Sequence, residues 1–131
     1  MFNIVRFMVK KIMIVDDDPS VRYTLKNGFE LYEEYNVTTV ESGFQCLDML
    51  RNNQIPDIIL LDVMMPEMSG WETFNKIKAN AAWKDIPIIF LTARTDTVAK
   101  HAGEFLAEDY IEKPAKIPDI KDRIDKVLFK K

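Results

Sequence analysis

The sequence predicts an α/β fold in which a parallel sheet is covered by helices on both faces. The segments 57–61 and 87–91 carry consecutive apolar residues, as do strands that are buried on both faces. Segments with apolar residues at helical spacing separate these runs. Because strands that alternate with helices are joined by crossover connections, the strands of such a sheet run parallel to one another.

Five segments are predicted strands. They are short, rich in apolar or β-branched residues, and lie at 11–15, 35–40, 57–61, 87–91 and 110–111. Each is followed by a polar or turn-forming stretch before the next apolar pattern begins.

Five further segments are predicted helices. Asp18 and Pro19 mark the start of the first, as N-cap and first helical residue. Ser42 and Gln45 form a capping box for the second. The third runs from about 71 to 79, and the fourth is the weakly periodic segment 95–104. The last helix has a clean amphipathic pattern, carried by Ile117, Ile120, Ile124, Val127 and Leu128.

Right-handed crossovers leave few ways to arrange five such units. The flavodoxin-like, doubly wound order 2-1-3-4-5, with five helices around the sheet, is the natural choice. A length of 131 residues fits one compact domain. We expect this domain to span 10–131, with 1–9 as an N-terminal extension or a lead-in to the first strand and Met8 as an alternative start.

Composition excludes several classes of function. The net charge is -3, and no basic cluster indicates a nucleic-acid partner. No apolar run approaches the roughly 20 residues that span a bilayer. A single cysteine and a single histidine exclude an intramolecular disulfide and a Cys/His zinc site within the chain. We therefore expect a cytoplasmic protein with no membrane segment.

Polar side chains stand at the ends of the predicted strands. Asp16 and Asp17 follow the first strand, Asp62 the third, Thr92 the fourth, and Lys113 lies just beyond the fifth. The carboxyl ends of parallel strands share one edge, and the first and third strands are neighbours in the predicted order. Three carboxylates, a hydroxyl and an ammonium group should therefore converge there.

Carboxylates placed this close repel one another, and a divalent cation removes that repulsion. Mg²⁺ prefers oxygen ligands and retains some of its waters, so one or two direct carboxylates suffice. Mn²⁺ is an expected substitute. A carboxylate that attacks phosphorus forms an aspartyl phosphate, and such transfer needs mainly positioning and charge compensation. The set therefore predicts Mg²⁺-dependent phosphoryl transfer.

Four segments resemble the receiver domains of two-component response regulators. They are Ile14-Val-Asp-Asp-Asp-Pro19, Leu60-Leu-Asp-Val-Met-Met-Pro66 with Gly70, Leu91-Thr-Ala93 and Asp109-Tyr-Ile-Glu-Lys-Pro114. Each segment alone is weak, but four in this order, each at a predicted strand end, are specific. The resemblance extends from about residue 10 to the end of the chain.

The resemblance implies a role for each site residue. Asp62 is the expected phosphoacceptor and a metal ligand, and Asp17 is the direct ligand of the acidic pair, with Asp16 acting largely through water. The backbone carbonyl of Met64 completes the protein ligands. Thr92 and Tyr110 form the switch pair. Lys113 pairs with the phosphoryl group, and the Lys113–Pro114 peptide bond is expected to be cis.

The resemblance also implies partners. A sensor histidine kinase or a histidine phosphotransfer protein would donate the phosphoryl group, and a downstream protein would read the face formed by the fourth helix, fifth strand and fifth helix. A homodimer of the phosphorylated form is a further option. Ala115 departs from the aromatic residue usual in the family, and Leu106-Ala107 departs from the usual Gly-Ala. Both departures lie on the surface that the family uses for partners, so they bear on which partner binds rather than on phosphoryl transfer at Asp62.

Three alternatives remain open. Asp16, Asp18 and Ser20 nearly match the D-x-D-x-[TV] pattern of haloacid-dehalogenase-type phosphatases, in which Asp16 would be the nucleophile. The chain could be a degenerate receiver that only binds proteins. It could also be a receiver excised from a longer multidomain regulator or hybrid kinase. In the receiver interpretation the chain is a signalling domain rather than an enzyme, because it catalyses only its own phosphorylation and dephosphorylation.

Overall fold

The computed structural model describes residues 9–93 and 107–129. Along the chain these residues form β1 (Lys10–Val15), α1 (Pro19–Glu30), β2 (Tyr35–Val40), α2 (Gly43–Arg51), β3 (Ile58–Leu61), α3 (Gly70–Lys78), β4 (Ile88–Thr92), β5 (Asp109–Glu112) and α5 (Ile117–Leu128). All five predicted strands are present, with ends that lie close to those expected. The predicted fourth helix, at 95–104, lies outside the described residues, which contain four of the five expected helices.

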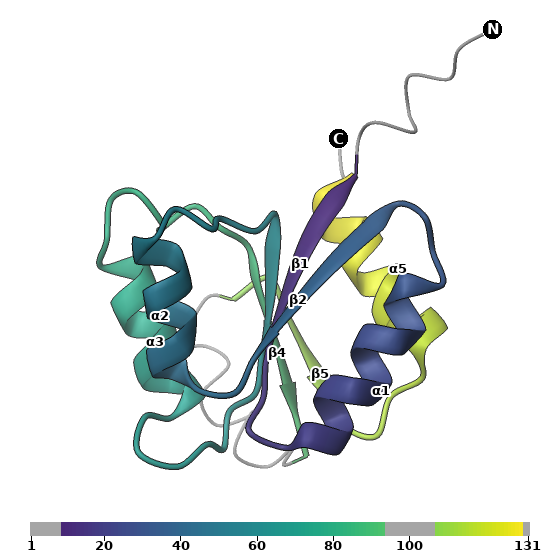
Figure 1. The fold of residues 1–131 in the computed structure, drawn as a ribbon, viewed down its shortest axis with the longest axis horizontal. Coiled ribbons are helices and arrows are strands. Elements are labelled where there is room, and N and C mark those ends of the chain that lie inside the picture. Colours follow the sequence, from purple (N-terminus) through teal and green to yellow (C-terminus); the bar gives the residue numbers. More distant parts are fainter. Residues whose placement is uncertain (1–8, 94–106, 130–131) are drawn as a thin grey trace, which may run out of the picture.

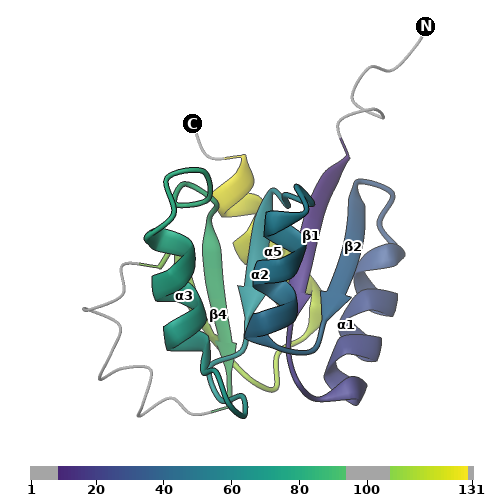
Figure 2. The ribbon, with the colours of Figure 1, turned by 60° about the vertical axis from the view of Figure 1, so that its left-hand side comes forward.

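The strands form one parallel sheet in the order β2-β1-β3-β4-β5, so the predicted topology is confirmed. Helices α1 and α5 cover one face of the sheet, and α2 and α3 cover the other (Figure 1). Figure 2 shows α2 and α3 side by side over the sheet. The chain changes winding direction between β1 and β3, which is where open α/β sheets of this kind place their sites.

The central strands are buried on both faces, as their unbroken apolar runs predict. In β1, Met13 and Val15 pack toward α2 and α3, whereas Ile12 and Ile14 pack toward α1 and α5. In β3, all four residues are at most 1% exposed. Side chains alternate between the faces of a strand, so each central strand contributes to both core layers. The sheet is therefore a rigid support for the residues at its edge.

The helix starts follow the capping chemistry of the sequence. The carboxylate of Asp18 accepts a hydrogen bond from the Ser20 amide, and Pro19 occupies the first helical position, as predicted. Ser42 accepts from the Gln45 amide, but the Gln45 side chain accepts from the Glu41 amide rather than completing a box with Ser42. Side chains thus satisfy backbone amides at the starts of α1 and α2.

A polar cluster ties α5 to the start of β2, at the sheet edge opposite the carboxyl ends of the strands. The hydroxyl of the buried Tyr35 donates a hydrogen bond to Asp125. The Lys121 ammonium lies 2.7 Å from the same carboxylate and 5.1 Å from the centre of the Tyr32 ring. None of the described helices is long and apolar enough to cross a membrane.

Replacing Tyr35 with Phe should destabilise the fold by about 1 kcal/mol, because the Asp125 carboxylate loses a donor. Urea unfolding monitored by circular dichroism measures the change. Tyr23→Phe is the matched control, since the Tyr23 side chain is 72% exposed and its hydroxyl should contribute less than about 0.5 kcal/mol. Equal stability of the two variants would show that the Tyr35 contact contributes nothing.

Candidate functional site

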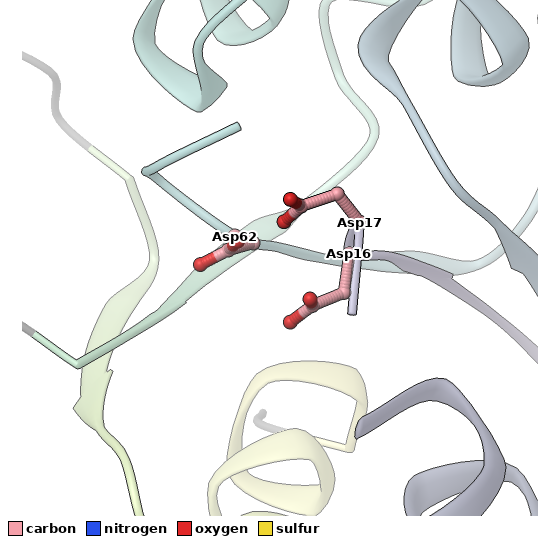
Figure 3. A group of neighbouring side chains, drawn as sticks. All are labelled: Asp16, Asp17 and Asp62. Atoms are coloured by element: carbon pink, nitrogen blue, oxygen red, sulfur yellow. The ribbon is translucent and has the colours of Figure 1, made fainter. Parts of the chain in front are cut away.

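Three carboxylates meet where β1 and β3 end. Asp16 and Asp17 follow β1, and Asp62 follows β3 (Figure 3). Val15 and Leu61 are register partners, and the Asp62 amide donates to the Val15 carbonyl at 2.9 Å. One carboxylate oxygen from each of the three aspartates lies within 4.8 Å of the others. The register of two neighbouring strands thus brings together residues that are far apart in the sequence.

Lys113 lies against the same carboxylates. Its Nζ is 2.6 Å from Asp16 Oδ2 and 3.4 Å from Asp62 Oδ1. The Lys113–Pro114 peptide bond is cis, as predicted. The Lys113 amide donates to the Thr92 carbonyl at 2.7 Å. The loop after β5 is therefore held beside the end of β4, with the ammonium group facing the acidic residues.

Burial and repulsion set the ionisation of this site. Burial raises the pKa of Asp62 to about 6, and the charge of Asp16 acts in the same direction, while Lys113 opposes both. Burial lowers the pKa of Lys113, but its hydrogen bond to Asp16 and the charge of Asp62 outweigh burial and raise that pKa overall. The lysine therefore stays charged. Its single positive charge does not balance three carboxylates.

This donor set fits a hard divalent cation. Its oxygens are close enough together to share one ion, and they include both buried and exposed carboxylates. Asp16 is 2% exposed and Asp62 6% exposed, so their charges are poorly screened by water. Asp17 is exposed and offers a carboxylate toward solvent. A cation held here would offset the repulsion that raises the pKa of Asp62.

Gly70 allows α3 to begin directly against the end of β3. A Cβ atom at this position would lie 2.1 Å from the Asp62 carbonyl oxygen, which no side chain can do. The Gly70 amide donates to the Val63 carbonyl at 2.8 Å, and Ser69 and Glu72 form a reciprocal capping box at the start of the helix. The sequence interpretation did not anticipate this box, although its Ser-x-x-Glu spacing is readable. It fixes the loop that follows Asp62.

The two predicted switch residues lie on the α2/α3 side of the sheet. Thr92 is 1% exposed at the end of β4, where it pairs in register with Glu112 of β5. Tyr110 is the register partner of Phe90, and the two rings stack with centroids 5.5 Å apart. Since side chains two apart on a strand share a face, Thr92 lies on the same face as Phe90 and Tyr110. The Met64 side chain is 63% exposed beside the site.

Arg22 makes a contact at this site that sequence reasoning missed. It lies in the first turn of α1, and its Nη1 donates to the carbonyl oxygen of Asp16 at 2.7 Å. The sequence alone offers no signal for this contact, because an arginine on the first turn of a helix is ordinarily a surface residue. Only the fold shows that this turn begins beside the end of β1.

The comparisons with known proteins agree with this geometry. A family model described as the response regulator receiver domain matches residues 12–125. That match covers most of the chain, and the chain therefore belongs to the family of response regulator receiver domains. A solved structure of a response regulator from Chloroflexus aurantiacus superposes with a TM-score of 0.84 at 31% identity, covering 93% of this chain and 99% of that one.

Longer proteins also contain similar segments. Response regulator MprA of a Mycobacterium species is 34% identical over 92% of this chain and 51% of its own length. A protein of Vibrio cholerae named as a probable cyclic di-GMP phosphodiesterase is 40% identical over 86% of this chain, but over 25% of its own length. The match to this chain thus covers about half the length of the first relative and a quarter of the length of the second.

The raised pKa of Asp62 predicts that Asp62→Asn stabilises the metal-free protein at neutral pH. In the unfolded chain Asp62 loses its proton near its ordinary pKa of 3.8, whereas the folded protein keeps that proton up to a pKa of about 6. The free energy of unfolding therefore falls as pH rises from 3.8 to about 6. A neutral Asn avoids this loss, which is on the order of 2 kcal/mol at pH 7. Below about pH 3, Asp62 is protonated in the folded and the unfolded protein alike, and the difference should vanish.

Urea unfolding in EDTA across this pH range measures the difference. Asp48→Asn is the control, because Asp48 is an exposed carboxylate remote from the site. If Asp62→Asn unfolded as readily as wild type at pH 7, the cost of burying a charged Asp62 beside Asp16 would be absent.

Proposed function

We propose that this receiver domain accepts a phosphoryl group from a phosphohistidine donor onto Asp62, in a Mg²⁺-dependent reaction that switches its binding to partners. The observation that carries the proposal is that Asp62 lies beside both the Asp16-Asp17 pair and the Lys113 ammonium, which also contacts Asp16. The three carboxylates can hold a cation, and the lysine supplies a second positive charge within 3.4 Å of Asp62. This arrangement compensates both the attacking carboxylate and the incoming phosphate.

In the proposed reaction, a carboxylate oxygen of Asp62 attacks phosphorus. The new O–P bond forms as the P–N bond to the donor imidazole breaks, and the electron pair leaves with the imidazole nitrogen, which takes a proton from solvent. Lys113 already lies within 3.4 Å of Asp62, so its ammonium can pair with the equatorial oxygens of the transferring group. Positioning and charge compensation are the main demands of such transfers.

Asp17, Asp62 and the Met64 carbonyl would hold the Mg²⁺ ion directly, with Asp16 acting largely through water. When bound, the ion offsets the negative charges of the nucleophile and the phosphoryl oxygens. Mn²⁺ should substitute because it accepts the same oxygen ligands. Asp16 is already engaged through both oxygens, by the Lys113 ammonium and by the Asp18 amide at 2.9 Å. Those contacts favour an outer role for Asp16.

Thr92 and Tyr110 are the proposed switch. The Thr92 hydroxyl would donate to a phosphoryl oxygen on Asp62, and movement at the end of β4 would let the Tyr110 ring turn inward. The stacking of Tyr110 on Phe90, two residues before Thr92, supports a coupling between these positions. Phosphorylation would then shift the population between two conformations. The surface that changes would be the face formed by the predicted fourth helix, β5 and α5.

The family implies a histidine kinase or a histidine phosphotransfer protein as the donor. We assign the receiver unit to 10–131 and place it in the cytoplasm, where such donors act. Both relatives described above are longer than this chain, which favours a receiver that belongs to, or works beside, further domains. A homodimer of the phosphorylated form would use the same β5 and α5 face.

The haloacid-dehalogenase alternative makes Asp16 the nucleophile. The contacts of Asp16 argue against it, because Lys113 and the Asp18 amide already occupy its two oxygens, and the side chain is 2% exposed. Asp62 has one oxygen 3.4 Å from Lys113 and faces the acidic pair across the end of the sheet. Asp62 is therefore the better acceptor.

Treatment with acetyl phosphate and Mg²⁺ should add one phosphoryl group to the wild-type protein. Intact-mass spectrometry detects the addition, and chemical reduction followed by peptide mapping should locate it at Asp62. Asp62→Asn should take up no phosphate, because an amide oxygen is a poor nucleophile toward phosphorus. Uptake by Asp62→Asn equal to that of wild type, or mapping to Asp16, would refute the assignment.

Lys113→Ala should slow phosphorylation by about a hundredfold, since it removes a charge that faces the transferring group. Mg²⁺ should still bind, and more tightly than in wild type, because the proposed ligands remain and a positive charge beside them is lost. Lys116→Ala is the matched control: it removes the same charge from a position three residues away that makes no side-chain cap hydrogen bond. A rate in Lys113→Ala equal to that in Lys116→Ala would remove the lysine from the mechanism.

A further inference from the structure

Arg22 lies behind the acidic pair, on the first turn of α1. Its Nη1 donates to the Asp16 carbonyl at 2.7 Å, and its Nη2 is 3.8 Å from a carboxylate oxygen of Glu41. The Arg22 side chain is 19% exposed, whereas that of Glu41 is 61% exposed. The contact with Asp16 is therefore the better shielded of the two. Because it joins a charged donor to a backbone carbonyl, it is also directional.

Every polar group of Asp16 is held in place. Its amide donates to the Val40 carbonyl at 3.2 Å, and its carbonyl accepts from Arg22. Its two carboxylate oxygens accept from the Asp18 amide and from Lys113. Asp16 is thus fixed through the backbone as well as through its side chain.

The Asp16 carbonyl belongs to the same peptide unit as the Asp17 amide. A peptide unit is planar, so holding the carbonyl direction also fixes where the Cα atom of Asp17 lies. Asp17 is exposed, and one of its carboxylate oxygens lies within 4.8 Å of those of Asp16 and Asp62 (Figure 3). Loss of the hydrogen bond from Arg22 would free that peptide to rotate.

We propose that Arg22 is a positioning residue for the metal site, which orients the Asp16–Asp17 peptide so that Asp17 offers its carboxylate to the cation. This inference rests on the proposed function. If Arg22 positions Asp17, it strengthens Mg²⁺ binding, whereas its positive charge alone would weaken that binding. A cation near an acidic cluster weakens Mg²⁺ binding by repulsion, so removal of a merely electrostatic arginine would tighten binding. Removal of a positioning arginine loosens it.

The test compares Arg22→Gln with Arg51→Gln. The control removes the same charge, but Arg51 is exposed at the end of α2 and pairs with Asp48. Amide NMR of each protein in EDTA, followed by titration with MgCl₂, gives the metal-free structure and the Mg²⁺ dissociation constant. Urea unfolding in EDTA gives the stability. Arg22→Lys, which keeps the charge and one donor, serves as the conservative variant.

Arg22→Gln should bind Mg²⁺ about tenfold more weakly than wild type, in the range seen when groups that orient metal ligands are removed. Arg22→Lys should recover part of the loss, and Arg51→Gln should bind as wild type does. In EDTA, the Asp17 amide resonance should shift in Arg22→Gln but not in Arg51→Gln. Saturating Mg²⁺ should restore the rate of phosphorylation by acetyl phosphate in Arg22→Gln.

Several outcomes would overturn the proposal. Arg22→Gln could bind Mg²⁺ as tightly as wild type or more tightly, or Arg51→Gln could lose as much affinity. If Arg22→Gln does not fold in EDTA, the decision passes to Arg22→Met, which keeps the apolar stem but has no donor, and unchanged Mg²⁺ affinity in that variant would refute the role. The proposed function is tested separately in wild type. If the wild-type protein takes up phosphate on Asp62 but Arg22→Gln binds Mg²⁺ as tightly as Arg51→Gln, only the role of Arg22 is contradicted and the proposed function stands.

Discussion

Repulsion among three carboxylates at the ends of two neighbouring strands is the constraint on which the site depends. The register of β1 and β3 places Asp16, Asp17 and Asp62 side by side, and one carboxylate oxygen from each lies within 4.8 Å of the others. Burial raises the pKa of Asp62 to about 6, and the charge of Asp16 acts in the same direction. The Lys113 ammonium, 3.4 Å away, offsets only part of this. The core stabilises this arrangement, since both faces of β1 and β3 are packed.

The same constraint explains the surrounding backbone. Gly70 lets α3 begin where any side chain would collide with the Asp62 carbonyl, and the Ser69–Glu72 box holds that start. The hydrogen bond from the Lys113 amide to the Thr92 carbonyl holds the loop after β5 beside the end of β4. A site strained by its own charge is poised to respond when a cation or a phosphoryl group changes that charge. This is the physical basis on which we propose signalling by population shift.

The sequence predicted the fold because its signals are local and strong. Buried strands have unbroken apolar runs, and Asp18-Pro19 is a typical helix start. Right-handed connections between parallel strands then leave few possible strand orders. Convergence of Asp16, Asp17 and Asp62 also followed, because parallel strands end at one edge. The contact of Arg22 with the Asp16 carbonyl could not be predicted, since it depends on the angle at which α1 leaves the sheet. The Gln45 side chain accepts from the Glu41 amide instead of the Ser42 amide, and the spacing of Ser42 and Gln45 does not decide between these two neighbouring donors.

Paramagnetic broadening by Mn²⁺ tests the central claim most directly. Mn²⁺ bound at the carboxylates broadens amide resonances more strongly the nearer they lie to the ion. The structure predicts that a substoichiometric addition broadens Asp16, Asp17 and the residues just after β3 first, and leaves the start of β2 at the opposite sheet edge sharp. Competition with MgCl₂ should reverse the effect. Uniform broadening, or loss of signal first at another part of the surface, would contradict the account.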